Sequence, residues 1–181
     1  MPKRPRLLVS KCLLGEKCRY DGLLVQDVFV RKLLPHCELY AVCPECEMGL
    51  PVPRPKVKMV ETPAGKRLVI EDAGIDMTNQ IEHVSARVFG ALGEINGVVL
   101  KSRSPSCGLY DAKVYHEGDF EHPIGRDIGF FAREVLMQYP HLPVESDETL
   151  LDPQTRHQFL INIFSGESYP PELLHYPEDT D

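Results

Sequence analysis

Three cysteines follow three apolar segments that are typical of buried strands. Cys12 follows RLLVSK, Cys43 follows ELYAV, and Cys107 lies in the loop after GVVL. In an open parallel sheet, all carboxyl ends of the strands lie at one edge, and ligands bind in the crevice there. The sequence therefore predicts that three thiols from distant parts of the chain meet in one crevice.

Three thiolates in one crevice are suited to metal binding. Soft sulfur ligands select zinc, copper(I) or an iron–sulfur cluster. A cluster of four irons would use three protein thiolates and leave one iron open as a Lewis acid, as catalytic zinc keeps an open position. Polar residues that no packing argument requires stand next to these cysteines: Glu45, Ser102, Ser104 and Ser106.

The serines belong to the segment KSRSPSCG, whose composition predicts a turn with backbone N–H groups directed inward. Such groups bind an anion or donate hydrogen bonds to cluster sulfurs. Ser102 and Ser106 are therefore candidate substrate-binding residues. Arg19 and Asp21, in the loop after Cys12, are either further substrate contacts or a solvated turn.

Two other uses of the thiols compete with an iron–sulfur cluster. Cys12, Cys18, Cys43 and Cys46 would suffice for a four-thiolate zinc site that stabilises a non-enzymatic binding module. Cys43 and Cys46 also form a C-x-x-C pair, typical of thiol redox proteins. That motif normally opens a helix, whereas a proline-rich segment follows here. Cys37 has no such context and is interpreted as structural.

Strands and helices must alternate to position these residues. Apolar periodicity predicts strands at 6–10, 38–42, 97–100 and 142–144, a short strand or hairpin at 66–71, and helices at 25–34, 76–92, 129–139 and 152–164. The proline-rich segment 48–63 should be extended or looped, and a glycine-containing loop should surround 118–125.

This alternation predicts an α/β fold: a single domain with a mostly parallel sheet and helices on both faces, a Rossmann-like three-layer sandwich. The expected division is an α/β domain at 1–150, followed at 151–181 by a C-terminal helix and an acidic, proline-rich tail that wraps or frays. A length of 181 residues fits one such unit.

Composition excludes several classes of protein. Hydrophobic residues at 43% and charged residues at 26% are ordinary for a globular chain. No apolar stretch reaches the roughly 18 residues of a membrane span. A net charge of −7 argues against polymeric nucleic acid as a partner. No signal-peptide cleavage site follows the apolar N-terminal segment, so we expect a cytoplasmic protein without a disulfide framework.

Four motifs, VSKCLLGEKCRYDG, VCPECEMGLPVPRP, GIDMT and LKSRSPSCGLYD, resemble the TudS-type thiouracil desulfidase family, long known as a bacterial domain of unknown function, family 523. The resemblance covers roughly residues 7–144. The later segment LLDPQTRHQFLINIF is similar to the linker found where this domain is fused to a second one.

The resemblance implies a [4Fe–4S] cluster held by Cys12, Cys43 and Cys107, with Glu45 and Ser104 in catalysis. It implies removal of sulfur from a small thiolated nucleobase or nucleoside, such as thiouracil, with release of sulfide. The open iron would act as a Lewis acid, with no net redox change. We expect an aerobic preparation to lose the cluster or to hold zinc in its place.

Two cysteines inside the motifs depart from what the resemblance requires. Cys18 or Cys46 would close the open iron if either supplied a fourth ligand. The exact substrate and the oligomeric state are not predicted.

Overall fold

A four-stranded parallel sheet forms the centre of the computed structural model, which describes residues 4–166 and 168–176. Its strand order is β2-β1-β6-β9, and each neighbouring pair is parallel. The strands are β1 (Arg6–Ser10), β2 (Glu38–Val42), β6 (Gly97–Leu100) and β9 (Val144–Ser146). The first three match their predicted bounds, and β9 begins two residues later than predicted.

Helices cover both faces of this sheet. They are α1 (Val28–Leu33) and α5 (Pro153–Ile163) on one face, and α3 (Thr78–Leu92) and α4 (Phe130–Gln138) on the other. Side chains alternate along a strand, so Leu7 and Val9 pack with the α1 and α5 side chains while Leu8 packs with those of α3 and α4. The predicted three-layer α/β sandwich is therefore present.

A second sheet was not predicted. It has the order β5-β4-β3-β7-β8, formed by β3 (Val57–Thr62), β4 (Gly65–Ile70), β5 (Ile75–Asp76), β7 (Ala112–His116) and β8 (Asp119–Asp127). The extended segment 48–63 ends in strand β3, and the expected loop at 118–125 is mostly strand β8. The apolar pattern missed β8 because this edge strand is largely exposed and polar, and it contains Pro123.

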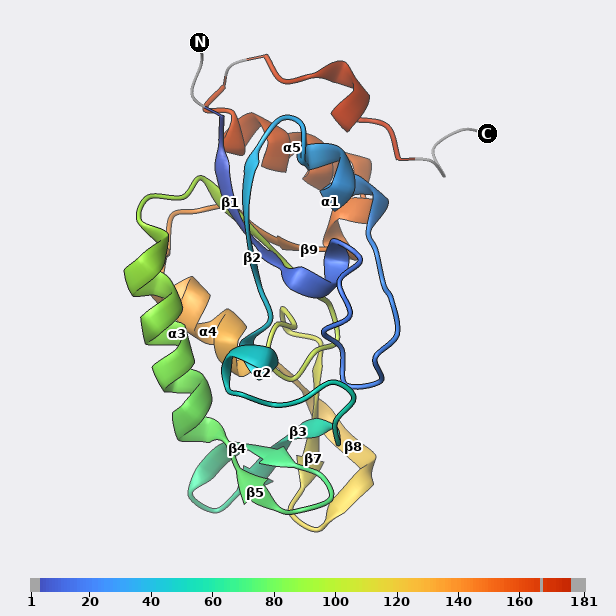
Figure 1. Cartoon of the computed structure of the whole chain (residues 1–181), viewed down its shortest axis with the longest axis vertical. Coiled ribbons are helices and arrows are strands. Elements are labelled where there is room, and N and C mark those ends of the chain that lie inside the picture. The colour runs from blue at the N-terminus through green and yellow to red at the C-terminus, as the bar shows by residue number, and fades with distance from the viewer. Residues whose placement is uncertain (1–3, 167, 177–181) are drawn as a thin grey trace.

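The second sheet lies beyond the carboxyl ends of the parallel strands, in the lower part of Figure 1. Short elements fill the region between the sheets: the 3-10 helix η1 (Lys11–Leu13) after β1, and α2 (Pro44–Glu47) after β2. Sequence reasoning missed α2, which lasts about one turn and begins with Pro44, a residue well suited to the first helical position.

The C-terminal segment packs against the core. After η2 (Thr149–Leu151) and α5, the chain forms η3 (Pro171–Leu173) and buries Leu173 and Tyr176. The Tyr176 hydroxyl donates to Asp27 Oδ2 over 2.7 Å, and the buried Arg156 Nε donates to the Leu174 carbonyl over 3.0 Å. The described tail thus wraps the α1 side of the sandwich. The remaining predicted tail positions, 167 and 177–181, lie outside the described residues.

None of the helices in residues 4–166 and 168–176 is long and apolar enough to cross a membrane.

Candidate active site

A cavity of about 400 Å³ lies at the carboxyl ends of β1, β2 and β6. Cys12 reaches it from η1, Cys43 from the start of α2, and Cys107 from the loop after β6. The structure therefore brings together the three thiols that the strand-end argument selected. The separation in sequence is large, and only the parallel arrangement of the strands makes them neighbours.

The other cysteines are placed differently. Cys18 also lines the cavity, whereas Cys46 and Cys37 do not. The Cys43 and Cys46 thiols each donate to the Cys18 carbonyl over 3.5 Å. Electrostatic contacts link the Cys18 thiol to those of Cys12 and Cys43, and the Cys46 thiol to that of Cys43, so the four thiols of the alternative zinc site are also neighbours.

Without a metal, the thiols of Cys43 and Cys107 hold their protons. Burial raises the pKa of Cys107 to about 12, opposed by hydrogen bonds with Ser10 and Ser104. A hydrogen bond with Cys18, followed by burial, raises the pKa of the Cys43 thiol. Metal binding at these residues must therefore displace protons, as thiolate coordination generally does.

The loop that carries Cys107 is organised by the Ser104 side chain. Ser104 Oγ accepts hydrogen bonds from the backbone N–H groups of Ser106 (3.2 Å) and Cys107 (3.0 Å). Helix α4 holds this loop from outside, because the Phe130 N–H donates to the Pro105 carbonyl over 3.0 Å. The predicted turn of KSRSPSCG is thus fixed in place, although its backbone N–H groups are used within the loop.

Gly129, at the start of α4, makes this contact possible. A Cβ at this position would lie 2.5 Å from the Ser106 carbonyl oxygen and 2.9 Å from the Cys107 nitrogen. We expect Gly129→Ala to displace the loop and to lower the free energy of unfolding by about 1–3 kcal/mol, as overpacking does at other sites. The same change should weaken metal retention at Cys107. Thermal unfolding and iron content measure the two effects. Gly90→Ala on α3 is the control, because an added Cβ there meets nothing within 4 Å; equal effects of both changes would contradict the prediction.

Glu45 extends from α2 into the cavity and is held on both oxygens. Ser106 Oγ donates to Oε1 over 3.0 Å, and Arg54 Nη2 donates to Oε2. Arg54, whose side chain is only 2% exposed, also donates to the carbonyls of Cys18 (3.0 Å) and Pro51 (3.2 Å). Sequence reasoning missed Arg54. The available signal was a single cation inside the proline-rich segment PVPRP.

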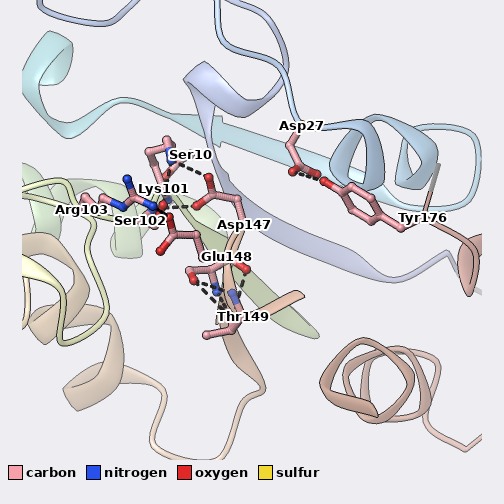
Figure 2. Close-up of polar contacts among 10 residues, drawn as sticks. Ser10, Asp27, Lys101, Ser102, Arg103, Asp147, Glu148, Thr149 and Tyr176 are labelled. Atoms are coloured by element: carbon pink, nitrogen blue, oxygen red, sulfur yellow. Dashed lines mark hydrogen bonds and ion pairs between the residues drawn. The ribbon is translucent and has the colours of Figure 1, made fainter. Parts of the chain in front are cut away.

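A network of polar residues joins the ends of three parallel strands (Figure 2). Lys101 Nζ contacts Asp147 Oδ2 and donates to Ser102 Oγ over 2.8 Å. The backbone N–H of Ser102 donates to Asp147 Oδ1 over 2.7 Å, and that of Lys101 donates to Ser10 Oγ over 2.9 Å. Sequence reasoning singled out only Ser102. The other three share a signal, because each is a polar residue at the carboxyl end of a parallel strand.

Cations outnumber carboxylates on the cavity wall. Five lining cations each pair with a carboxylate: Lys11 with Glu16, Arg19 with Asp21, Arg54 with Glu45, Lys101 with Asp147, and Arg103 with Glu148. Of these carboxylates, Glu45 and Glu148 line the cavity. Each cation is therefore neutralised by its own carboxylate, and the wall offers paired N–H donors rather than a net positive charge.

The remaining predicted substrate contacts are only partly at the cavity. Arg19 and Ser102 line the cavity, whereas Asp21 and Ser106 do not line it and contact residues that do. The Arg19 guanidinium binds both carboxylate oxygens of Asp21, and this contact lowers the pKa of Asp21 to about 2. Ser106 instead contacts Glu45, as described above.

Donor chemistry therefore fits a sulfur-bound metal group at Cys12, Cys43 and Cys107. Across residues 4–166 and 168–176, no three His, Cys, Asp or Glu side chains are arranged to hold a metal ion. The fit consequently rests on three soft donors that share one cavity.

A second cavity of about 280 Å³ shares Tyr20, Glu45, Arg103 and Pro105 with the first. Its other lining residues come mainly from β3, β7 and their flanks: Lys56, Val57, Lys58, Lys113 and Tyr115. The sheet that was not predicted therefore supplies one wall of the larger site.

Comparison with known proteins places this site in a family. The family model described as 2-thiouracil desulfurase matches residues 7–147, and this match includes every candidate residue named above except Glu148. The chain belongs to the 2-thiouracil desulfurase family.

The chain is also similar to two known proteins. The protein YbbK of Bacillus subtilis (strain 168), described as uncharacterized, is 32% identical over 109 residues, which cover 56% of this chain and 72% of YbbK. A solved structure, named [4Fe-4S]-dependent thiouracil desulfidase TudS, is 29% identical. It matches with a TM-score of 0.66 and covers 87% of this chain and 99% of its own. The resemblance inferred from the motifs is confirmed.

Proposed function

We propose that this protein is a desulfidase that removes sulfur from thiolated nucleobases or nucleosides such as thiouracil, with a [4Fe–4S] cluster held by Cys12, Cys43 and Cys107. One observation carries the proposal: these three thiols and the Glu45 carboxylate line a single cavity of about 400 Å³. Family membership and the TudS likeness support the same reaction and cofactor.

The protein's own groups have distinct tasks in this reaction. When bound, the cluster would supply a Lewis acid that polarises the thiocarbonyl group. Glu45 removes a proton from the water that attacks the thiocarbonyl carbon. Arg54 and Ser106 hold the Glu45 carboxylate in place, one on each oxygen. Ser104 orients the substrate from the loop that carries Cys107.

The chemistry balances without an electron acceptor. A C–O bond forms as water adds, the C–S bond breaks, and the oxygen remains on the base as a carbonyl. The two protons of water are shared between the departing sulfide and solvent, and Glu45 returns to its starting state. Hydrolysis of this kind gives uracil and sulfide from thiouracil.

The test is anaerobic purification and reconstitution, followed by assays on 2-thiouracil, 4-thiouracil and their nucleosides. We expect about four irons and four acid-labile sulfides per chain, and one sulfide released for each desulfurised base. A loaded protein that releases no sulfide from any of these compounds would contradict the activity. One tightly bound zinc without labile sulfide would favour the binding module.

A further inference from the structure

The most exposed ion pair of the cavity wall lies between Arg103 and Glu148. Arg103 Nη2 contacts Glu148 Oε1, and the side chains are 67% and 39% exposed (Figure 2). By contrast, the Arg54 and Lys101 side chains in the same wall are 2% and 20% exposed. Arg103 and Glu148 therefore stand where the cavity opens to solvent.

This pair has unused hydrogen-bonding groups. Among the described residues, Nε and Nη1 of Arg103 and Oε2 of Glu148 have no hydrogen-bond partner. By contrast, Arg19 donates hydrogen bonds from Nε and Nη2 to Asp21, and Arg54 donates hydrogen bonds from Nη1 and Nη2 to four acceptors. The opening of the cavity, here called the mouth, thus offers a guanidinium donor and a carboxylate acceptor side by side.

The position of Arg103 is held by its backbone. Its φ of 58° lies in the left-handed region, which a residue other than glycine rarely adopts. The absence of a Cβ at Gly108 leaves room for the Asp111 carboxyl group further along the same loop, whose Oδ1 would lie 2.3 Å from such an atom. Backbone strain of this kind concentrates at functional positions.

Arg103 also lines both cavities, so it stands between the thiol-containing space and the space walled by β3 and β7. A ligand that extends from one space into the other meets the residues common to both, Tyr20, Glu45, Arg103 and Pro105.

We propose that Arg103 and Glu148 recognise the edge of the substrate base that adjoins the thiocarbonyl. A thiolated uracil carries a ring N–H next to the thiocarbonyl, followed by a carbonyl group. With its sulfur turned toward the three thiols, the ring presents these two groups to the wall and mouth. Arg103 then donates to the carbonyl oxygen, and Glu148 accepts the ring N–H.

This inference rests on the proposed desulfidase function and adds the residues that set its specificity. Paired donor and acceptor groups read base edges in this way elsewhere, since a mismatched base leaves a polar group unpaired. Arg103 and Glu148 would thereby favour thiolated pyrimidines over thioamides that lack the adjoining carbonyl.

The test uses the reconstituted protein and compares Arg103→Met, Glu148→Gln and the charge-swapped double variant Arg103→Glu/Glu148→Arg. We expect each single change to raise KM for thiouracil about tenfold, with kcat changed less than about threefold. The dissociation constant of uracil, measured by calorimetry, should rise by the same factor. Arg87→Met removes an equally exposed ion pair on α3 and is the matched control.

The charge-swapped variant separates recognition from a structural ion pair. It restores attraction across the mouth but exchanges donor and acceptor, so we expect the weak binding of uracil to persist. Recovery of wild-type KM and uracil affinity in this variant would overturn the proposal, as would single variants that match Arg87→Met.

A methylated substrate tests on its own whether Glu148 accepts the ring N–H. Methylation of the ring nitrogen between the thiocarbonyl and the carbonyl should weaken binding to the wild type about tenfold and have little effect on Glu148→Leu, which has no acceptor. Equal discrimination by both proteins would remove Glu148 from recognition. Absence of sulfide release by the wild type would instead refute the proposed function, while the uracil titrations would still test the pair.

Discussion

Alanine at Cys12, Cys43 or Cys107 is expected to abolish stoichiometric iron retention. Each thiol comes from a separate strand end, and the one further thiol among the described lining residues, Cys18, lies in the loop after η1. Losing one of three protein ligands should therefore release the whole cluster rather than a fraction of it. Iron and acid-labile sulfide, measured after anaerobic reconstitution, report the loss, and circular dichroism checks the fold.

Cys37→Ala is the matched control, because Cys37 is buried like Cys12 and Cys107 but lies away from the cavity. It should retain wild-type iron content. Cys18→Ala should do the same, and loss of iron in that variant would assign Cys18 as a fourth ligand and close the open position. Stoichiometric iron in any of the three ligand variants would exclude that residue from the ligand set.

Glu45→Gln should lower kcat by about 10²–10⁴-fold, the usual contribution of a positioned general base, while iron content stays unchanged. Glutamine has nearly the same size and can still accept from Ser106, but it cannot take a proton from water. The measurement is the rate of sulfide release per loaded cluster. Glu47→Gln, an exposed change on the same short helix, is the control and should keep full activity.

A complication of Glu45→Gln is the buried Arg54, which loses its carboxylate partner. Removal of one partner of a buried ion pair can lower the free energy of unfolding by about 3–5 kcal/mol. The double variant Glu45→Gln/Arg54→Met removes the unpaired charge and should recover part of the lost stability without recovering turnover. Return of activity in the double variant would show that Glu45 acts through stability and not through proton transfer.

The parallel sheet was predictable because its strands are short, continuous apolar segments. Leu7, Leu8 and Val9 are fully buried on both faces of β1, and this gives a strong local signal. The convergence of Cys12, Cys43 and Cys107 then followed from strand direction alone.

The second sheet and the residues around Glu45 were not predictable in the same way. Strand β8 is exposed and polar, so no apolar alternation marks it. Arg54 takes its role from contacts with Cys18, Pro51 and Glu45, which depend on how a proline-rich loop folds back. The roles of Lys101 and Asp147 required the pairing of β6 with β9, which a single sequence does not specify.

The order of the parallel strands also sets when the site is completed during synthesis. The first strand made, β1, lies between β2 and β6, and β9 closes the sheet only after residues 144–146 have emerged. Asp147 and Glu148, which hold Lys101 and Arg103, follow directly. Cys12 and Cys43 are thus translated more than 100 residues before Asp147 and Glu148, and the cavity wall is completed only when those two residues have emerged. The two earliest thiols therefore wait for residues from the far end of the sheet before the site around them is enclosed.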